Sequence, residues 1–355
     1  MTASFVDAWR RAKSGAFDLA ANSTAGRTTQ VDFWGDVRRV YANANLSVYS
    51  AQRCNARCAF CVEELRPASR GGELAGQRTV EADDGRYFAS LERALDVVQA
   101  RLRPSVSVTG GEPSKDPRLP RILRTLAARG ARKRTVTTNG SGLLDVREGT
   151  RLVDWLGVTG VAHLNVSRAH PDQDRNARLM GYAEGPTSQD MRTIVAAAQQ
   201  GGARVRLSCV LVQGAIDSLE GVARYVGFAQ SLGVHQVIFR QLMKTDPRTV
   251  ARSSVVRFSD RTRVALEPLL DRISGDGRFA FVRQIVGYYY YVEVWRFEGT
   301  DVVFEEADLA GLEDAKRRDP QLVHELVLHP DGRLASTWQP WDGVLGRAEP
   351  VTTSR

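Results

Sequence analysis

Three things are scarce in this 355-residue chain: cysteine, lysine and long apolar runs. No apolar run approaches the roughly 18 residues that suggest a membrane helix, so we expect no membrane partner. The first residues lack the apolar stretch of a secretory signal, and we therefore expect a cytoplasmic protein. Apolar residues make up 43% and charged residues 25% of the chain, which is ordinary for a globular protein. This composition excludes collagen-like and wholly disordered chains.

Arginine takes the place of the missing lysine. Only five of the 49 basic residues are lysine, which leaves 44 arginines against 41 acidic residues and a net charge of +8. One interpretation is a solvated basic surface. The other is an anionic substrate or a nucleic acid, because guanidinium groups bind carboxylates and phosphates through two hydrogen bonds. Charge does not choose between them, but no run of five basic residues is present, which disfavours nucleic acid.

The four cysteines are Cys54, Cys58, Cys61 and Cys209, too few for a disulfide scaffold in a chain of this length. Three of them form a C-x3-C-x2-C pattern, which indicates a metal or redox site. Zinc would need a fourth ligand. A [4Fe–4S] cluster normally takes four thiolates, so three would leave one iron open to a substrate or cofactor. The alternatives are an incidental group of thiols and a zinc site completed by a distant residue.

Through the middle of the chain, short β-branched runs alternate with stretches that have apolar residues at spacings of three and four. The alternation predicts a parallel sheet, either an open doubly wound sheet or an incomplete barrel. Both architectures place ligands at the carboxyl ends of the strands. The predicted strands are 46–50, 105–109, 134–138, 161–167, 204–212 and 236–241. The predicted helices surround Tyr87–Val98, Leu119–Leu126, Met191–Ala198 and Leu219–Val226.

The flanking parts follow other patterns. We divide the chain into an N-terminal extension (1–44, with a helix at Phe5–Phe17), a core (45–245) and a C-terminal α+β region (246–355). The last region is expected to pack against the core or to cover its mouth. Its predicted elements are an aromatic strand segment at Phe281–Phe297, a helix at Leu309–Arg318 and a hairpin that turns at Pro330–Gly332.

The cysteine segment resembles the cluster loop of the radical S-adenosylmethionine (SAM) superfamily, including the aromatic Phe60 before the third cysteine. Two further segments resemble motifs of this family. Gly110, Gly111 and Glu112 begin a GGEP motif after the second predicted strand, and Thr138 and Asn139 begin a Thr-Asn-Gly element after the third. The resemblance covers residues 44–245. It implies an α/β fold built on a partial (β/α)6 TIM-like barrel.

The resemblance also implies the chemistry. The three clustered cysteines would ligate a [4Fe–4S] cluster whose fourth iron binds SAM. One electron, from a donor such as flavodoxin or ferredoxin, would cleave SAM to a 5′-deoxyadenosyl radical that takes a hydrogen atom from the substrate. Gly110 and Gly111 would let the backbone approach SAM closely, and Glu112 or an exposed carbonyl would accept a hydrogen bond from its ammonium group.

Alternation along two predicted strands extends this site. Ser208 shares a polar face that would line the barrel, whereas Cys209 shares the apolar face that would pack on helices. Ser167, on the polar face of the strand 161–167, and Ser208 are therefore predicted to bind the cofactor. Four residues that follow that strand are interpreted as further ligand contacts or as a solvated loop: Arg168, His170, Asp172 and Asn176.

The segments 205–214 and 239–243 resemble the molybdenum-cofactor GTP cyclase branch of the family. That branch has a second, C-terminal cluster, whereas this sequence has no cysteine after Cys209, and Gln241 replaces a glutamate of the branch. Single-cluster relatives in specialised metabolism, such as the cytosylglucuronate decarboxylase of nucleoside-antibiotic pathways, are more similar in organisation. They imply an anionic small-molecule substrate (a sugar, nucleoside or sugar acid) and a reaction such as decarboxylation.

Three alternative functions stay open from the sequence. The first is a radical SAM epimerase with a cysteine as hydrogen donor, which the predicted direction of Cys209 disfavours. The second is an enzyme of the same family that modifies RNA or a peptide. The third is a metal-binding module without catalytic activity. No catalytic residue is assigned on the sequence alone.

Overall fold

The computed structural model describes residues 28–50, 54–61, 83–182, 185–243, 254–286, 290–307, 309–338 and 342–347. The helix predicted at Phe5–Phe17 lies outside these residues. None of the helices in the described ranges is long and apolar enough to cross a membrane.

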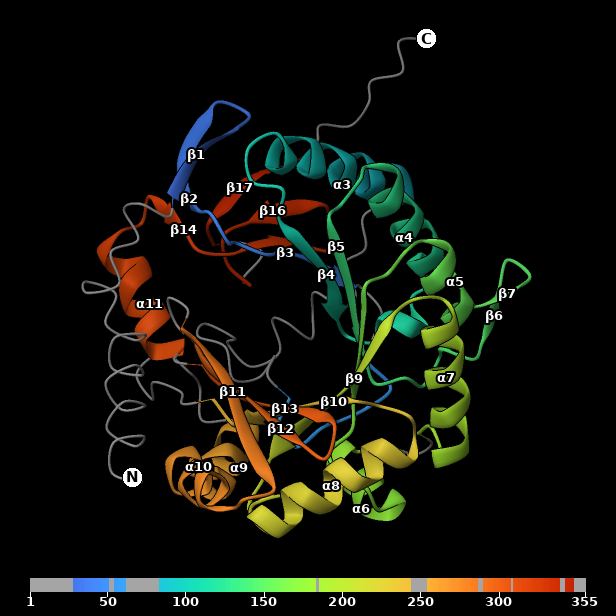
Figure 1. The fold of residues 1–355 in the computed structure, drawn as a ribbon. Coiled ribbons are helices and arrows are strands. Elements are labelled where there is room, and N and C mark those ends of the chain that lie inside the picture. Colours follow the sequence, from blue (N-terminus) through green and yellow to red (C-terminus); the bar gives the residue numbers. More distant parts are fainter. Residues whose placement is uncertain are drawn as a thin grey trace.

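Six parallel strands, adjacent in chain order, form the centre of the molecule (Figure 1). They are β3 (Leu46–Ser50), β4 (Ser105–Gly110), β5 (Lys133–Thr138), β8 (His163–Ser167), β9 (Arg204–Leu211) and β10 (Gln236–Gln241). Each coincides with a predicted strand apart from shifts of one or two residues at its ends. The six strands and their parallel pairing are therefore confirmed.

Helices cover the outward face of these strands (Figure 1). They are α3 (Asp84–Gln99), α4 (Leu119–Ala128), α5 (Leu152–Val158), α6 (Gln173–Met180), α7 (Ser188–Gln200) and α8 (Leu219–Ser231). The apolar stripes of α3, α4, α5, α7 and α8 and alternate strand residues, such as Leu91, Val136 and Leu207, share one buried core, whereas Met180 of α6 packs in a separate small cluster. Because strand side chains alternate between faces, the polar residues of the same strands line the inner face.

Short elements join these strands and helices. The 3-10 helix η3 (Pro113–Lys115) follows β4, and the small ladder of β6 (Val146–Arg147) and β7 (Thr150–Arg151) precedes α5.

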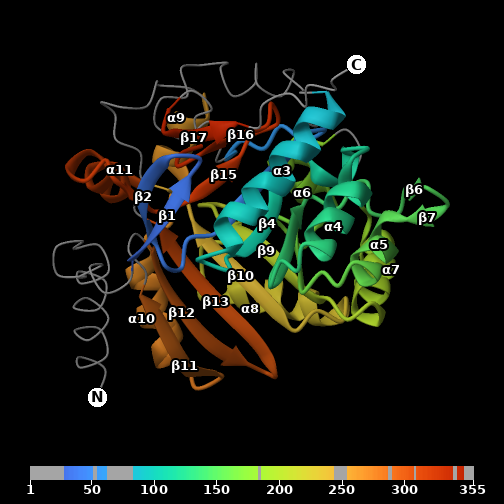
Figure 2. The same ribbon diagram turned by 90° about the horizontal axis from the view of Figure 1, so that it is seen from above.

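The C-terminal residues extend this sheet at both ends (Figure 2). Beyond β10 come β13 (Thr300–Ala307), β12 (Tyr290–Phe297) and β11 (Phe279–Val286), and beyond β3 come β15 (Leu326–Leu328), β16 (Arg333–Ala335) and β17 (Val344–Arg347). The result is a mixed sheet of twelve strands. Its two end strands, β11 and β17, do not pair with each other in the described part of the chain. The fold is therefore α/β, and the described strands do not close into a barrel.

The remaining C-terminal elements agree with the sequence pattern. The helix α11 spans Leu309–Arg318, and the hairpin of β15 and β16 turns at the predicted Pro330–Gly332. Two further helices, α9 (Ser254–Thr262) and α10 (Leu266–Gly275), precede β11.

One element differs from the sequence analysis. Within the expected extension, β1 (Thr28–Phe33) and β2 (Asp36–Tyr41) form a hairpin, and β14 (Leu322–Val323) pairs with β2. Trp34 and Gly35 make the turn with positive φ angles of 58° and 98°. The alternating pattern that buries Val31 and Phe33 is short and lies among polar residues. For this reason the sequence pattern did not predict the hairpin.

Candidate active site

Glu112 joins the loops that follow β4 and β5. Its side chain is 1% exposed and accepts hydrogen bonds from the backbone N–H (2.8 Å) and hydroxyl (2.6 Å) of Ser114, the hydroxyl of Thr138 and the backbone N–H of Asn139 (2.7 Å). Burial raises the pKa of Glu112, whereas these hydrogen bonds lower it. Because both carboxylate oxygens already have protein donors, this side chain holds the two loops together.

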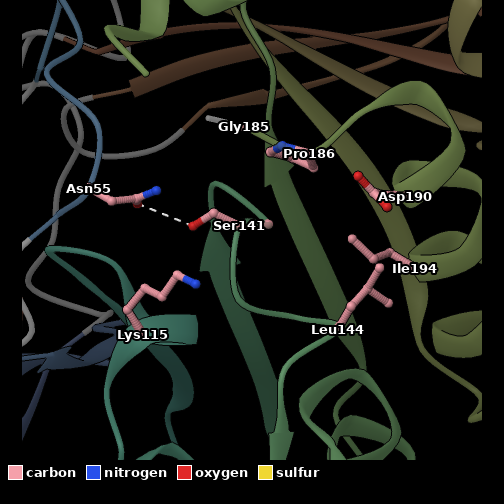
Figure 3. Close-up of a pocket in the computed structure, with 9 residues that line it drawn as sticks. Asn55, Lys115, Ser141, Leu144, Gly185, Pro186, Asp190 and Ile194 are labelled. Carbon is pink, nitrogen blue, oxygen red and sulfur yellow. Dashed lines mark hydrogen bonds between the residues drawn. The ribbon is translucent and has the colours of Figure 1, made fainter. Parts of the chain in front are cut away.

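Asn139 links these loops to the cysteine segment. Its side-chain amide donates to Oδ1 of Asn55 (2.9 Å) and to Sγ of Cys54 (3.7 Å), while its own Oδ1 accepts from the N–H of Ser141 (3.0 Å). Ser141 also donates its hydroxyl proton to Asn55, at 3.2 Å (Figure 3). The sequence analysis did not find Asn55 or Ser141, because no motif marks them. The structure thus brings the first cysteine and the Thr-Asn-Gly element together.

The cysteine segment docks on the end of α6. The N–H groups of Arg57 and Ala59 donate to the carbonyls of Met180 (3.0 Å) and Leu179 (3.3 Å). Carbonyls in the last turn of a helix have no partner within the helix, so the segment supplies the missing donors. Gly181 ends α6 with a φ of +63°, and a Cβ there would lie 2.5 Å from the carbonyl oxygen of Arg57. The helix end and the segment therefore fit only with glycine at this position.

Phe60 anchors the same segment. Its ring is 7% exposed and packs in a small apolar cluster with Ala169, Met180, Val212 and Leu242. Sγ of Cys58 lies 3.8 Å from Sδ of Met180 in the same region. An aromatic residue before the third cysteine is thus used to fix the loop against α6 and the ends of β9 and β10.

The three clustered cysteines are partly buried. Burial raises the pKa of the Cys58 thiol, and the neighbouring Cys61 and Cys54 raise it further. Cys58 is therefore the thiol that the other two cysteines influence. In the described ranges, no three His, Cys, Asp or Glu side chains are gathered at metal-binding geometry. The three thiol groups would therefore have to move closer together to bind one metal cluster.

Gly110 has a structural role besides the one expected. Its φ is +117°, and a Cβ at this position would lie 2.7 Å from the backbone nitrogen of Ser50. The backbone of Gly110 thus approaches the end of β3 too closely for a side chain to fit between them. Gly111 follows it and is partly buried.

The four residues after β8 make hydrogen bonds that order the loop and the start of α6. Arg168 is 2% exposed, and its guanidinium donates to the carbonyls of His170 (3.1 Å), Pro171 (3.1 Å) and Pro186 (3.4 Å). Asp172 caps α6, and Asn176 accepts a hydrogen bond of 2.8 Å from the N–H of Ala169. His170 accepts from the N–H of Asp172 at 3.0 Å. A ligand-contact role for Arg168, Asp172 and Asn176 stays a prediction.

The two serines lie where strand alternation places them. Ser167 and Ser208 are register partners on β8 and β9. Cys209 is fully buried in the core between the sheet and the helices, with its Sγ 3.5 Å from the carbonyl oxygen of Ala169. The predicted direction of Cys209 is therefore confirmed.

A cavity of about 440 Å³ lies beside the cysteine segment (Figure 3). Asn55 and Ser141 form one wall, and Lys115 and Asp190 bring opposite charges to it. The ammonium group of Lys115 also bonds Asp145 at 3.1 Å. The loops that carry the predicted motifs thus border an open, polar space at the carboxyl ends of the strands.

Residues 48–226, half of the chain, match the radical SAM superfamily. The chain belongs to this superfamily of enzymes, whose members use a [4Fe–4S] cluster and SAM.

Two curated relatives are GTP 3′,8-cyclases. The chain is 29% identical over 244 residues to that of Paracoccus denitrificans, and 33% identical over 184 residues to that of Mycolicibacterium smegmatis. These matches cover 66% and 50% of this chain, and 64% and 46% of the two cyclases. The chain therefore spans about half to two-thirds of the length of the relatives it matches.

Among solved structures, Streptococcus suis SuiB bound to its precursor peptide SuiA is similar with a TM-score of 0.52. The match covers 83% of this chain and 59% of SuiB at 15% sequence identity. At this identity, the likeness concerns the fold alone.

The residues present fit these cofactors. Three thiols on one braced segment are the soft donors that iron–sulfur clusters take, and they would leave one iron of a four-iron cluster without a protein ligand. The loops linked by Glu112 and Asn139 border the same segment, as a site for a cluster-bound ligand requires.

Proposed function

We propose that Cys54, Cys58 and Cys61 hold a [4Fe–4S] cluster and that SAM binds beside it, against the loops after β4 and β5. When bound and reduced, the cluster supplies the electron that cleaves SAM to a 5′-deoxyadenosyl radical, which abstracts a hydrogen atom from the substrate. The single observation that carries this proposal is the chain of contacts from Cys54 through Asn139 to Glu112. It joins three loops that are far apart in sequence into one site.

Each of the cofactor residues has a distinct proposed task. Since the carboxylate of Glu112 is occupied by Ser114, Thr138 and Asn139, the backbone carbonyls of Gly110 and Gly111 are the groups proposed to accept from the SAM ammonium. Phe60 fixes the cluster segment. Ser167 and Ser208 lie side by side on the inner face of the sheet. Their hydroxyl groups are proposed to donate hydrogen bonds to SAM from that face.

The six central strands are proposed to work as an open (β/α)6 barrel whose lumen is the inner face of the sheet. The order of β3 to β10 and the position of the helices on one face support this interpretation. The substrate would then enter the lumen, with its reacting C–H bond near the carboxyl ends of β8 and β9.

The proposed substrate is an anionic small molecule such as a sugar acid, a nucleoside derivative or a sugar phosphate. The arginine surplus and the polar inner face support it. Residues 210–355 hold no cysteine, so they supply no thiols for a second cluster. The electron is proposed to come from a protein donor of the flavodoxin or ferredoxin kind.

Stimulation of SAM cleavage tests the substrate class. The reconstituted, reduced protein is given SAM with carboxylated, phosphorylated or neutral sugars and nucleosides, and 5′-deoxyadenosine is measured over time. We expect anionic compounds to raise the rate above the substrate-free background and neutral analogues to leave it unchanged. Equal stimulation by the neutral analogues would overturn the proposed substrate class.

A further inference from the structure

Four cationic or titratable side chains gather at the amino ends of three adjacent strands. Lys133, His163 and Arg204 are the first residues of β5, β8 and β9, and Arg206 follows two residues later. The register pairs His163 with Arg204 and Asn165 with Arg206. All four share the polar inner face, because they alternate with the core residues Val136, Leu164 and Val205.

No carboxylate balances these groups. Within the described residues, Lys133, Arg204 and Arg206 make no ion pair, and the charged neighbours that lower the pKa of His163 and Arg206 are all cations. Two carboxylates on the inner side of β13 are already paired. Asp301 bonds Arg296 at 2.7 Å, and Glu305 bonds Arg240 at 3.2 Å.

The side chain of His163 and the Nε atom of the half-buried Arg206 are withdrawn from water without a protein partner. His163 is 7% exposed, and its Nδ1 has no hydrogen-bond partner. The Nε of Arg206 and the Oδ1 of Asn165 are also buried and lack partners. An unsatisfied buried polar atom destabilises the folded protein, and like charges held close together add repulsion. A bound oxyanion would remove both costs for His163 and Arg206.

We propose that Arg206, together with Lys133, His163 and Arg204, binds an oxyanion of the substrate, a carboxylate or a phosphate, inside the barrel. This inference rests on the proposed function. Arg206 lies two residues below Ser208 on β9, which is about 7 Å along the strand. That separation matches about one sugar unit, so an anion held by Arg206 places the rest of the substrate toward SAM.

Titration of the holoenzyme with inorganic phosphate and, separately, with acetate tests the subsite. Binding is followed by calorimetry, against chloride at equal ionic strength. We expect Arg206→Gln to weaken binding of the anion by tenfold or more, and Arg206→Lys, which keeps the charge but loses the planar fork, to have an intermediate effect. Arg192→Gln removes an exposed arginine of α7 and should bind as the wild type does. Phosphate binding without acetate binding would identify the anion as a phosphate, and the reverse as a carboxylate.

A second readout follows His163 directly. Its pKa, about 4 without an anion, should rise when phosphate binds, and this shift is visible in the proton NMR titration of the ring. The signal is assigned by its loss in His163→Gln. An unchanged pKa, or equal anion affinity of the wild type and Arg206→Gln, would overturn the proposal. If Arg206→Gln does not fold, the proposal is tested with Arg204→Gln and with the NMR titration of the wild type.

The two proposals fail separately. SAM cleavage without substrate does not depend on the subsite, so the control Arg192→Gln should form 5′-deoxyadenosine at the wild-type background rate. Normal anion binding with no SAM cleavage in the wild type would contradict the proposed function only. Normal SAM cleavage with no anion binding would contradict the subsite only.

Discussion

The carboxylate of Glu112 accepts a hydrogen bond of 2.7 Å from the backbone N–H of Asn139. The two residues stand at the ends of neighbouring strands, and the Asn139 side chain continues the contact to Asn55 and Cys54. One buried carboxylate therefore fixes the position of the loop that touches the first cluster cysteine. Glu112 is thus a positioning residue for the site.

Replacing Glu112 with glutamine tests this link. The amide places an NH₂ group against N–H and O–H donors, so at least one of the present hydrogen bonds is lost. We expect a loss of stability of about 1 to 3 kcal/mol and weaker SAM binding. Iron content should stay near that of the wild type, because the cysteines are unchanged. Thermal unfolding and SAM titration of the reconstituted variant measure both effects. Unaltered SAM affinity would contradict the positioning role.

Cys58 and Cys209 should respond in opposite ways to replacement by alanine. Cys58→Ala removes a proposed cluster ligand, so iron and sulfide content and SAM cleavage are expected to collapse. Cys209→Ala leaves a small gap in the core, with a cost of about 1 to 2 kcal/mol, and keeps the cluster. Iron analysis and the visible spectrum compare the two variants. If Cys209→Ala cleaved SAM but made no product, a hydrogen-donor role would replace the one described here.

Gly181→Ala should damage the cluster site, and Gly130→Ala provides a matched control. Both glycines have similar positive φ angles, +63° and +67°, so both variants carry the same backbone strain of about 1 kcal/mol. Only at Gly181 would the added Cβ meet the carbonyl of Arg57, whereas nothing lies within 4 Å at Gly130. We expect lower iron content after reconstitution for Gly181→Ala alone. Equal iron content in both variants would show that the docking of the segment on α6 does not matter.

His163 predicts a loss of stability in mild acid. Burial and the nearby Arg206, Lys133 and Arg204 lower its pKa from 6.5 to about 4. Between these values the unfolded chain binds a proton that the folded chain does not, so stability falls as the pH decreases from about 6.5 toward 4. The difference between pH 7 and pH 5 is about 2 kcal/mol.

Denaturant unfolding of the wild type and His163→Gln at both pH values measures this contribution. The glutamine variant should lose about 2 kcal/mol less on acidification, while His324, whose pKa is also lowered to about 4, acts equally in both proteins. A pH dependence that is identical in the two proteins would contradict the buried, neutral state of His163.

Local patterns predicted the parallel strands and the direction of Cys209 well. The strands between Leu46 and Gln241 combine β-branched runs with turn residues, and each is bounded by an amphipathic stretch. The alternation of Ser208 and Cys209 needs only the period of a strand. The division of the chain at residues 44 and 245 and the cofactor roles of the two serines stay predictions.

Contacts between distant segments were beyond the sequence patterns. The pairing of β13 with β10 and of β15 with β3 depends on strand edges that no local signal specifies. The buried guanidinium of Arg168 donates to backbone carbonyls. Every residue has such a carbonyl, so the residue types of the partners do not reveal these contacts. For the same reason the docking of the cysteine segment on the carbonyls of α6 was not found.

Formation of 5′-deoxyadenosine tests the central claim most directly. The protein is reconstituted with iron and sulfide without oxygen, reduced, mixed with SAM, and assayed by mass spectrometry together with the electron paramagnetic resonance of the cluster. The account predicts a cluster signal that changes when SAM is added, and 5′-deoxyadenosine that is absent from Cys58→Ala. A four-iron cluster that neither responds to SAM nor cleaves it, even with anionic sugars present, would contradict this claim. The remaining interpretation would then be a metal-binding module without catalytic activity.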